Sequence, residues 1–271
     1  MNAAVVRKSL REAAVLIVIL TIAGVGFEIV FVRAMREFAS DLTRVWFSRP
    51  MIRQLIGALV GADLAESVTP TGLVTVGLAH PLIYALTWTL LLSIGTRVIA
   101  GEVDRGTADL LMSLPVSRGS LYTSVSAAWM IASVVASFAP VVGIWIGQRV
   151  FPFWEPIEMS RLWLVAVNLL ALDVGVSCVT LFVSTLVSRR GMAVAIALAG
   201  LLVSFLINFL VQLWPAVDRI GFLGLLHYYR PLAIVRSGAL PWRDLFVLLG
   251  VALVAWLAGL WRFRRRDIPA A

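Results

Sequence analysis

Long apolar stretches alternate with short polar ones along the whole chain. A membrane-spanning helix needs roughly 20 mostly apolar residues, and six stretches have about that length. Lipid offers no partner to open backbone groups, so each stretch is expected to be a helix. The pattern predicts an all-α integral membrane protein with six transmembrane helices in a single transmembrane domain, residues 1–271. The predicted spans are 13–32, 73–96, 121–148, 162–187, 191–213 and 245–261.

The composition supports this class and excludes others. Of the 271 residues, 61% are hydrophobic and 14% are charged, whereas soluble domains have about 45–50% and about 25%. The mean hydropathy is +0.95. These values exclude an ordinary soluble enzyme and a disordered protein. The only cysteine, Cys178, cannot form an internal disulfide.

The distribution of basic residues predicts the orientation of the spans. The first apolar stretch follows a basic segment but has no small-x-small cleavage site after it, so we expect a retained helix. Arg and Lys are nearly twice as dense in the segments predicted to be inside, mainly through residues 262–266 and the pair Arg189–Arg190. Both termini are therefore expected to be cytoplasmic, in a multi-pass protein of the cell inner (cytoplasmic) membrane. The net charge of +8 indicates topology and attraction to anionic membrane lipid, not nucleic acid.

Two segments on the predicted outer side have an apolar pattern but are too short to cross a membrane. After Pro50, apolar residues fall on one helical face, which predicts a short amphipathic helix at the membrane surface; they are Ile52, Leu55, Ile56, Leu59 and Val60. Residues 220–226 form a second apolar run, for which we expect a half-buried or re-entrant piece.

The inner loop between the second and third spans carries the most informative pattern. Thr107 is a suitable N-cap, and Pro115 ends the predicted helix about two turns later. Most residues between them are apolar, although the loop faces the cytoplasm. A two-turn helix is not stable alone in water, so it must dock on other protein. It can dock on the protein's own spans or in a groove of a partner.

This loop also resembles a known family. It reads GEVDRGTADLLMSLPVSR, similar to the pattern E-x-x-x-G-T-x-x-x-L-x-x-x-P-V-S-R of ABC transporter permeases of the exporter type-2 class. The large outer loop and the aromatic and basic tail at 263–267 are similar too. The resemblance implies a coupling helix that docks on a separate ATP-binding subunit. By resemblance, the docking residues are Glu102, Gly106, Thr107, Leu110, Leu111, Pro115 and Arg118, with Arg105 and Arg118 as candidates to pair with acids of the partner.

The resemblance further implies a complex of several chains. Two permease copies, or this chain and a homologue, would pair with two ATP-binding subunits, and the substrate would pass between the permeases. A P-loop requires Gly-Lys-Ser/Thr, and the only lysine of this chain, Lys8, follows Arg7. ATP and Mg²⁺ are therefore expected on the partner. We expect no catalytic, cofactor or metal site here, since His80 and His227 belong to no HExxH motif.

Polar residues inside the spans are candidates for a translocation path. Asp173 lies near the middle of the fourth span, where an ionised carboxylate costs roughly 2.5–3.5 kcal/mol on insertion scales. Ser177 and Thr180 follow on the same face, and Asn208 lies on the fifth span. These four residues could line the path or bond neighbouring helices. Glu28, near the outer end of the first span, is expected to reach water or to pair with Arg33.

Two other functions remain compatible with the sequence. An ion-coupled secondary transporter or channel would work without an ATPase and would use Asp173 and Glu28 as proton sites. Such carriers often contain internal repeats, and no convincing repeat relates residues 1–120 to 121–271. A membrane scaffold without transport activity is the third reading.

Overall fold

The structure is a computed structural model that describes residues 1–41, 50–60, 69–97, 99–104, 106 and 117–265. Every regular element in these ranges is a helix. Six spans are long and apolar enough to cross a membrane, as the sequence predicted. They are α1 (Ala3–Asp41), α3 with α4 (Pro70–Leu78 and Pro81–Arg97), α7 (Arg118–Val150), α8 (Met159–Leu186), α9 (Arg190–Leu213) and α12 (Trp242–Arg265).

The helices extend beyond the predicted spans, because an apolar pattern marks only the part suited to hydrocarbon. At the polar ends of α1, ion pairs four residues apart support further helical turns, such as Arg33 Nε to Glu37 Oε1 at 3.0 Å. The second span is two helices. Pro81 begins α4, since proline suits the first turn of a helix, whereas Pro140 stays inside α7.

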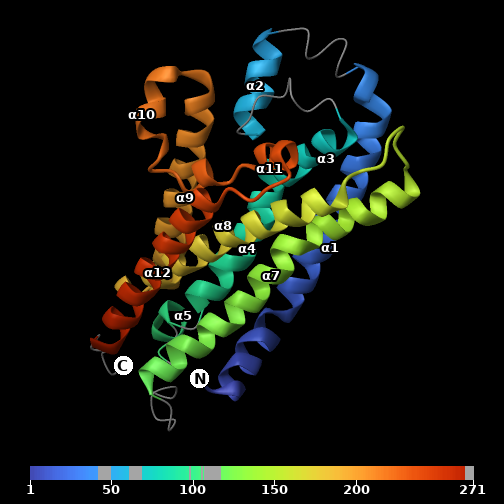
Figure 1. The fold of residues 1–271 in the computed structure, drawn as a ribbon. Helices are drawn as coiled ribbons and strands as arrows, with labels where there is room; N and C mark the ends of the chain where they lie inside the picture. The colour runs from blue at the N-terminus through green and yellow to red at the C-terminus, as the bar shows by residue number, and fades with distance from the viewer. Residues whose placement is uncertain (42–49, 61–68, 98, 105, 107–116, 266–271) are drawn as a thin grey trace.

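Helix α8 lies at the centre of the bundle. It packs against α4, α7, α9 and α12, while α1 lies along α7 at one edge (Figure 1). The start of α1, the start of α7 and the end of α12 lie together at one end of the molecule. We call this the inner end, because the sequence predicts that it faces the cytoplasm, and the opposite one the outer end.

Glycine allows α1 and α7 to approach each other closely. A Cβ added to Gly143 would lie 2.6 Å from the carbonyl oxygen of Val25, and one added to Gly147 would lie 3.0 Å from Cβ of Val32. Small residues at such crossings let helix backbones touch, which is how membrane helices gain packing energy. Gly143 and Gly147, four residues apart on one face of α7, thus allow α1 to lie directly against α7.

We expect Gly143→Ala to lower the stability of the bundle by about 1–3 kcal/mol, because the new methyl group meets backbone that cannot rotate away. Gly26→Ala is the matched control, since a Cβ there meets nothing within 4 Å. Thermal unfolding in detergent measures both variants. Equal melting temperatures for the two would contradict the close approach of α1 and α7.

Short helices cover the outer end. They are α2 (Pro50–Val60), η3 (Pro215–Val217), α10 (Asp218–Gly221), η4 (Leu225–Tyr228) and α11 (Pro231–Ser237). The helix predicted after Pro50 is confirmed as α2. The run at 220–226 is half-buried, as Leu226 is buried whereas Phe222 and Leu223 are exposed. Hydrogen bonds fix this cover to the spans: Tyr229 Oη donates to the Leu78 carbonyl at 3.2 Å.

His227 is part of a charged cluster in this cover. Arg230 lies beside it, with 3.2 Å between Arg230 Nη2 and His227 Nε2, and Arg230 also pairs with Asp244 at 3.3 Å. Burial lowers the pKa of His227 below its ordinary 6.5; Arg230 and Arg243 lower it too, while Asp244 and Asp218 raise it. The folded protein therefore holds this histidine neutral at pH values where the unfolded chain already binds a proton.

This difference predicts a loss of stability in acid. The contribution of neutral His227 is complete above about pH 6.5 and is lost as the pH falls from there towards the lower folded-state pKa. We expect the melting temperature in detergent to fall between about pH 7.5 and pH 5, and His227→Gln to reduce that fall. An unchanged pH profile in the variant would contradict the prediction.

Candidate functional site

Residues 100–104, which include the start of the inner-loop motif, are fixed to three spans. Helix α5 (Ala100–Asp104) follows α4, and its first three residues are buried. The Ala100 N–H donates to Ser184 Oγ of α8 at 3.1 Å, and Glu102 lies 3.8 Å from Lys8 Nζ of α1. Asp104 Oδ2 accepts from the backbone N–H of Arg190, the first residue of α9, at 3.4 Å. A displacement of α5 would therefore act on α1, α8 and α9.

Residues 117–119, at the end of the motif, are fixed as well. Ser117 caps α7, because its side chain accepts from the Ser120 N–H at 3.1 Å. Arg118 Nη1 donates to the carbonyl of Arg264 in α12 at 3.5 Å. The guanidinium of Arg264 covers Gly119, where an added Cβ would lie 2.8 Å from Nη2. This flank joins α7 to α12.

The predicted docking residues lie partly in these two segments and partly between them. Gly106 has φ of 67°, in the left-handed region that glycine tolerates best, which accounts for glycine at the end of α5. Glu102, Gly106 and Arg118 are therefore placed at the inner end. The other residues predicted to dock lie outside the described residues: Arg105, Thr107, Leu110, Leu111 and Pro115.

A polar seam runs between α7 and α8. Asp173 is 0% exposed, and its Oδ2 lies 2.8 Å from Ser137 Oγ. One turn away, the hydroxyl oxygens of Ser133 and Ser177 lie 3.4 Å apart. Asp173 therefore faces α7, and serine side chains of α7 and α8 meet across the seam.

Ser137 links the seam to the backbone of its own helix. Its Oγ lies 2.8 Å from Asp173 Oδ2 and 2.8 Å from the Ser133 carbonyl, and it is the donor in both contacts. Because a hydroxyl has one hydrogen, the two acceptors share it.

The four predicted path residues do not form one surface. Asp173 and Ser177 belong to the seam, whereas Thr180 lines a separate cavity between α8, α9 and α12. Asn208 is half-buried on α9 and lines neither that cavity nor the groove described below. Whether a substrate passes them stays a prediction.

Glu28 is a buried carboxyl group enclosed between α1, α3 and α7. It is 0% exposed, and neither carboxyl oxygen has a hydrogen-bond partner among the described residues. Gly77 and Gly143 leave room for it: an added Cβ on Gly143 would lie 2.8 Å from Glu28 Cβ, and one on Gly77 would meet the carboxyl group itself. The expectation that Glu28 reaches water or pairs with Arg33 is wrong, because Glu28 turns inward and Arg33 pairs with Glu37.

We expect Glu28→Met to raise the free energy of unfolding by about 1–3 kcal/mol, the usual cost of a buried polar group without a partner. The thioether chain has similar length and needs no hydrogen bond. Glu37→Met is the control, since that carboxylate is half-exposed in a surface ion pair and contributes about 1 kcal/mol at most. A lower melting temperature for Glu28→Met in detergent would show that the carboxyl group holds a partner.

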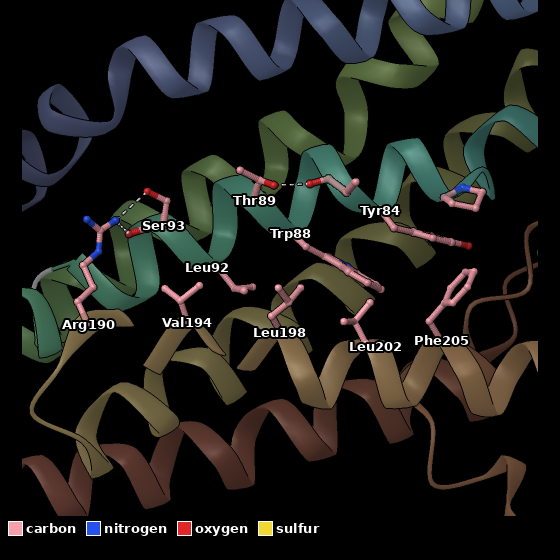
Figure 2. Close-up of a pocket in the computed structure, with 12 residues that line it drawn as sticks. Tyr84, Trp88, Thr89, Leu92, Ser93, Arg190, Val194, Leu198, Leu202 and Phe205 are labelled. Carbon is pink, nitrogen blue, oxygen red and sulfur yellow. Dashed lines mark hydrogen bonds between the residues drawn. The ribbon is translucent and has the colours of Figure 1, made fainter. Parts of the chain in front are cut away.

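A groove of about 450 Å³ with an exposed mouth lies between α4 and α9. Figure 2 shows Tyr84, Trp88 and Leu92 of α4 opposite Leu198 and Phe205 of α9, with Ser93 and Arg190 at the inner end of the groove. Sequence reasoning missed it. The spacing of four between Tyr84 and Trp88 was visible, but nothing in it identified α9 as the opposite wall.

No known family model matches the chain, and no curated protein matches it in sequence. Within the described part of the chain, no three His, Cys, Asp or Glu side chains come together as a metal site requires. The described residues contain four candidate features: the contacts around α5 at the inner end, the polar seam between α7 and α8, the enclosed carboxyl group of Glu28 and the apolar groove between α4 and α9.

Proposed function

We propose that this chain is the membrane-spanning permease subunit of an ATP-driven exporter of the ABC type-2 class. The observation that carries the proposal is the anchorage of the inner-loop motif. Its flanks contact five spans, through Lys8 of α1, Ser184 of α8, Arg190 of α9, Arg264 of α12 and the start of α7. A partner that moves the motif would therefore move most of the bundle.

The motif itself is suited to be held by a partner. Leu110 and Leu111 belong to an apolar stretch too short to be stable as an isolated helix, and a groove that buries them would supply that stability. Arg105 and Arg118 flank this stretch in sequence. Charged residues at the rim of such a contact set register more than affinity.

In this proposal ATP is hydrolysed on another subunit, because the sequence of this chain contains no P-loop. Without a Gly-Lys-Ser/Thr loop, this chain has no means to hold the terminal phosphates of ATP by a P-loop, so a separate subunit hydrolyses ATP with Mg²⁺. Two permeases, as two copies or as this chain with a homologue, enclose the substrate, and closure of the two ATP-binding subunits rearranges them. The seam at Asp173 and Ser177 becomes part of the path only if α7 and α8 separate.

The test is association with co-expressed ATP-binding subunits, and a protein of that kind encoded in a neighbouring reading frame would be the first one to use. We expect Leu110→Asp/Leu111→Asp to abolish co-purification, because two carboxylates in an apolar groove lose their hydration. Phe222→Asp/Leu223→Asp is the matched control, since both side chains are exposed at the outer end; this variant should keep the partner. Membrane insertion and melting temperature are measured for both variants, and an unchanged association of the first would contradict the proposal.

An ion-coupled carrier is the second candidate, favoured by the two buried carboxyl groups, Glu28 and Asp173, within the spans. It differs from the exporter in its energy source. Vesicles that contain only this chain would then move substrate in response to a pH gradient, and removal of ATP would have no effect.

A further inference from the structure

The groove between α4 and α9 is apolar along most of its length and polar at its inner end. Along most of its length the lining is apolar: Tyr84 and Trp88 stack at 5.5 Å with their rings 14° apart, and Leu198 and Leu202 form the facing wall. Trp88 is 6% exposed, whereas Leu202 is 55% exposed. The groove therefore has a fixed aromatic floor on α4 and an open side along α9 (Figure 2).

The inner end of the groove carries the guanidinium of Arg190, the residue whose backbone N–H bonds Asp104 Oδ2. Arg190 Nη2 donates to Ser93 Oγ at 3.2 Å and to the Ser93 carbonyl at 3.4 Å, and Arg190 Nε donates to Thr96 Oγ1 at 3.5 Å. These bonds to α4 hold the guanidinium across the end of the groove. The Nε and Nη2 donors are thus engaged with α4, and the guanidinium brings its positive charge to the end of the groove, where it attracts phosphate oxygens.

The length of the groove corresponds to one membrane leaflet. From Pro81 to Ser93, its lining extends over 12 residue-to-residue steps of α4, or about 18 Å at the helical rise of 1.5 Å per residue. Half of the hydrocarbon core is about 15 Å. With the inner end at the cytoplasmic surface, Arg190 lies at the depth of the headgroups, and the aromatic floor lies at the depth of the acyl chains.

We propose that this groove binds an anionic phospholipid of the cytoplasmic leaflet, with one acyl chain on Tyr84 and Trp88 and the phosphate on Arg190. The occupant has to be apolar along its length and negative at one end, as an anionic phospholipid is. Basic pockets between membrane helices on the cytoplasmic side bind such headgroups. The inference concerns a bound lipid and holds whether or not the chain works with an ATPase.

Quenching of tryptophan fluorescence tests the position of the chain. The full-length protein is placed in lipid nanodiscs with increasing fractions of phosphatidylglycerol or phosphatidylcholine that carry the same brominated acyl chains. The signal of Trp88 is the difference between the wild type and Trp88→Phe, which removes the contribution of the other tryptophans. We expect brominated phosphatidylglycerol to quench Trp88 with about fivefold higher apparent affinity than phosphatidylcholine, the ratio that one basic residue near anionic lipid supplies.

Two substitutions test the two ends of the groove. Arg190→Gln should abolish the preference for phosphatidylglycerol, whereas Arg189→Gln, which removes the same charge from an exposed neighbour outside the groove lining, should keep it. Ala85→Phe, which fills the groove from α4, should remove the quenching of Trp88 by both lipids. Equal quenching by the two lipids, a preference that survives Arg190→Gln, or no quenching of Trp88 at all would each overturn the proposal.

Discussion

The burial of α8 on all sides is the constraint on which the rest of the structure depends. A helix that carries Asp173, Ser177 and Thr180 on one side cannot present that side to lipid, because hydrocarbon provides no hydrogen bonds. The other spans surround it, and α7 supplies Ser133 and Ser137 where the polar side needs partners. The remaining helices then take positions around this pair, with α12 on α8 and α1 on α7.

The two ends of the bundle are built differently. At the outer end, short helices cover the spans and are tied down by Tyr229 and the Arg230–Asp244 pair. At the inner end, polar contacts connect α5 and the start of α7 to spans that are distant in sequence. A force applied to the inner end would therefore spread through several helices, which is the mechanical requirement for a membrane subunit moved by a partner.

The buried carboxyl groups and the groove lie in different surroundings. Glu28 and Asp173 lie deep between helices, where a carboxyl group is stable only if neutral or partnered. The groove on α4 and α9 instead opens to the side of the bundle and ends at Arg190. Glu28 and Asp173 can affect events inside the bundle, whereas the groove lies at the boundary between the bundle and the membrane. Substitutions can therefore alter the two carboxyl groups and the groove independently.

The sequence by itself determined the elements: six apolar spans, the short helix after Pro50, and an inward-facing Asp173 all follow from local pattern, since lipid imposes helices and excludes buried charge without partners. It also supplied the inner-loop motif. Only the tertiary structure decided which surfaces meet. The enclosure of Glu28 needs Gly77 and Gly143 from two other helices, and the groove needs α9 opposite Tyr84 and Trp88. Helical periodicity shows which residues share a face, but the neighbour of that face is set by packing between segments far apart in the chain.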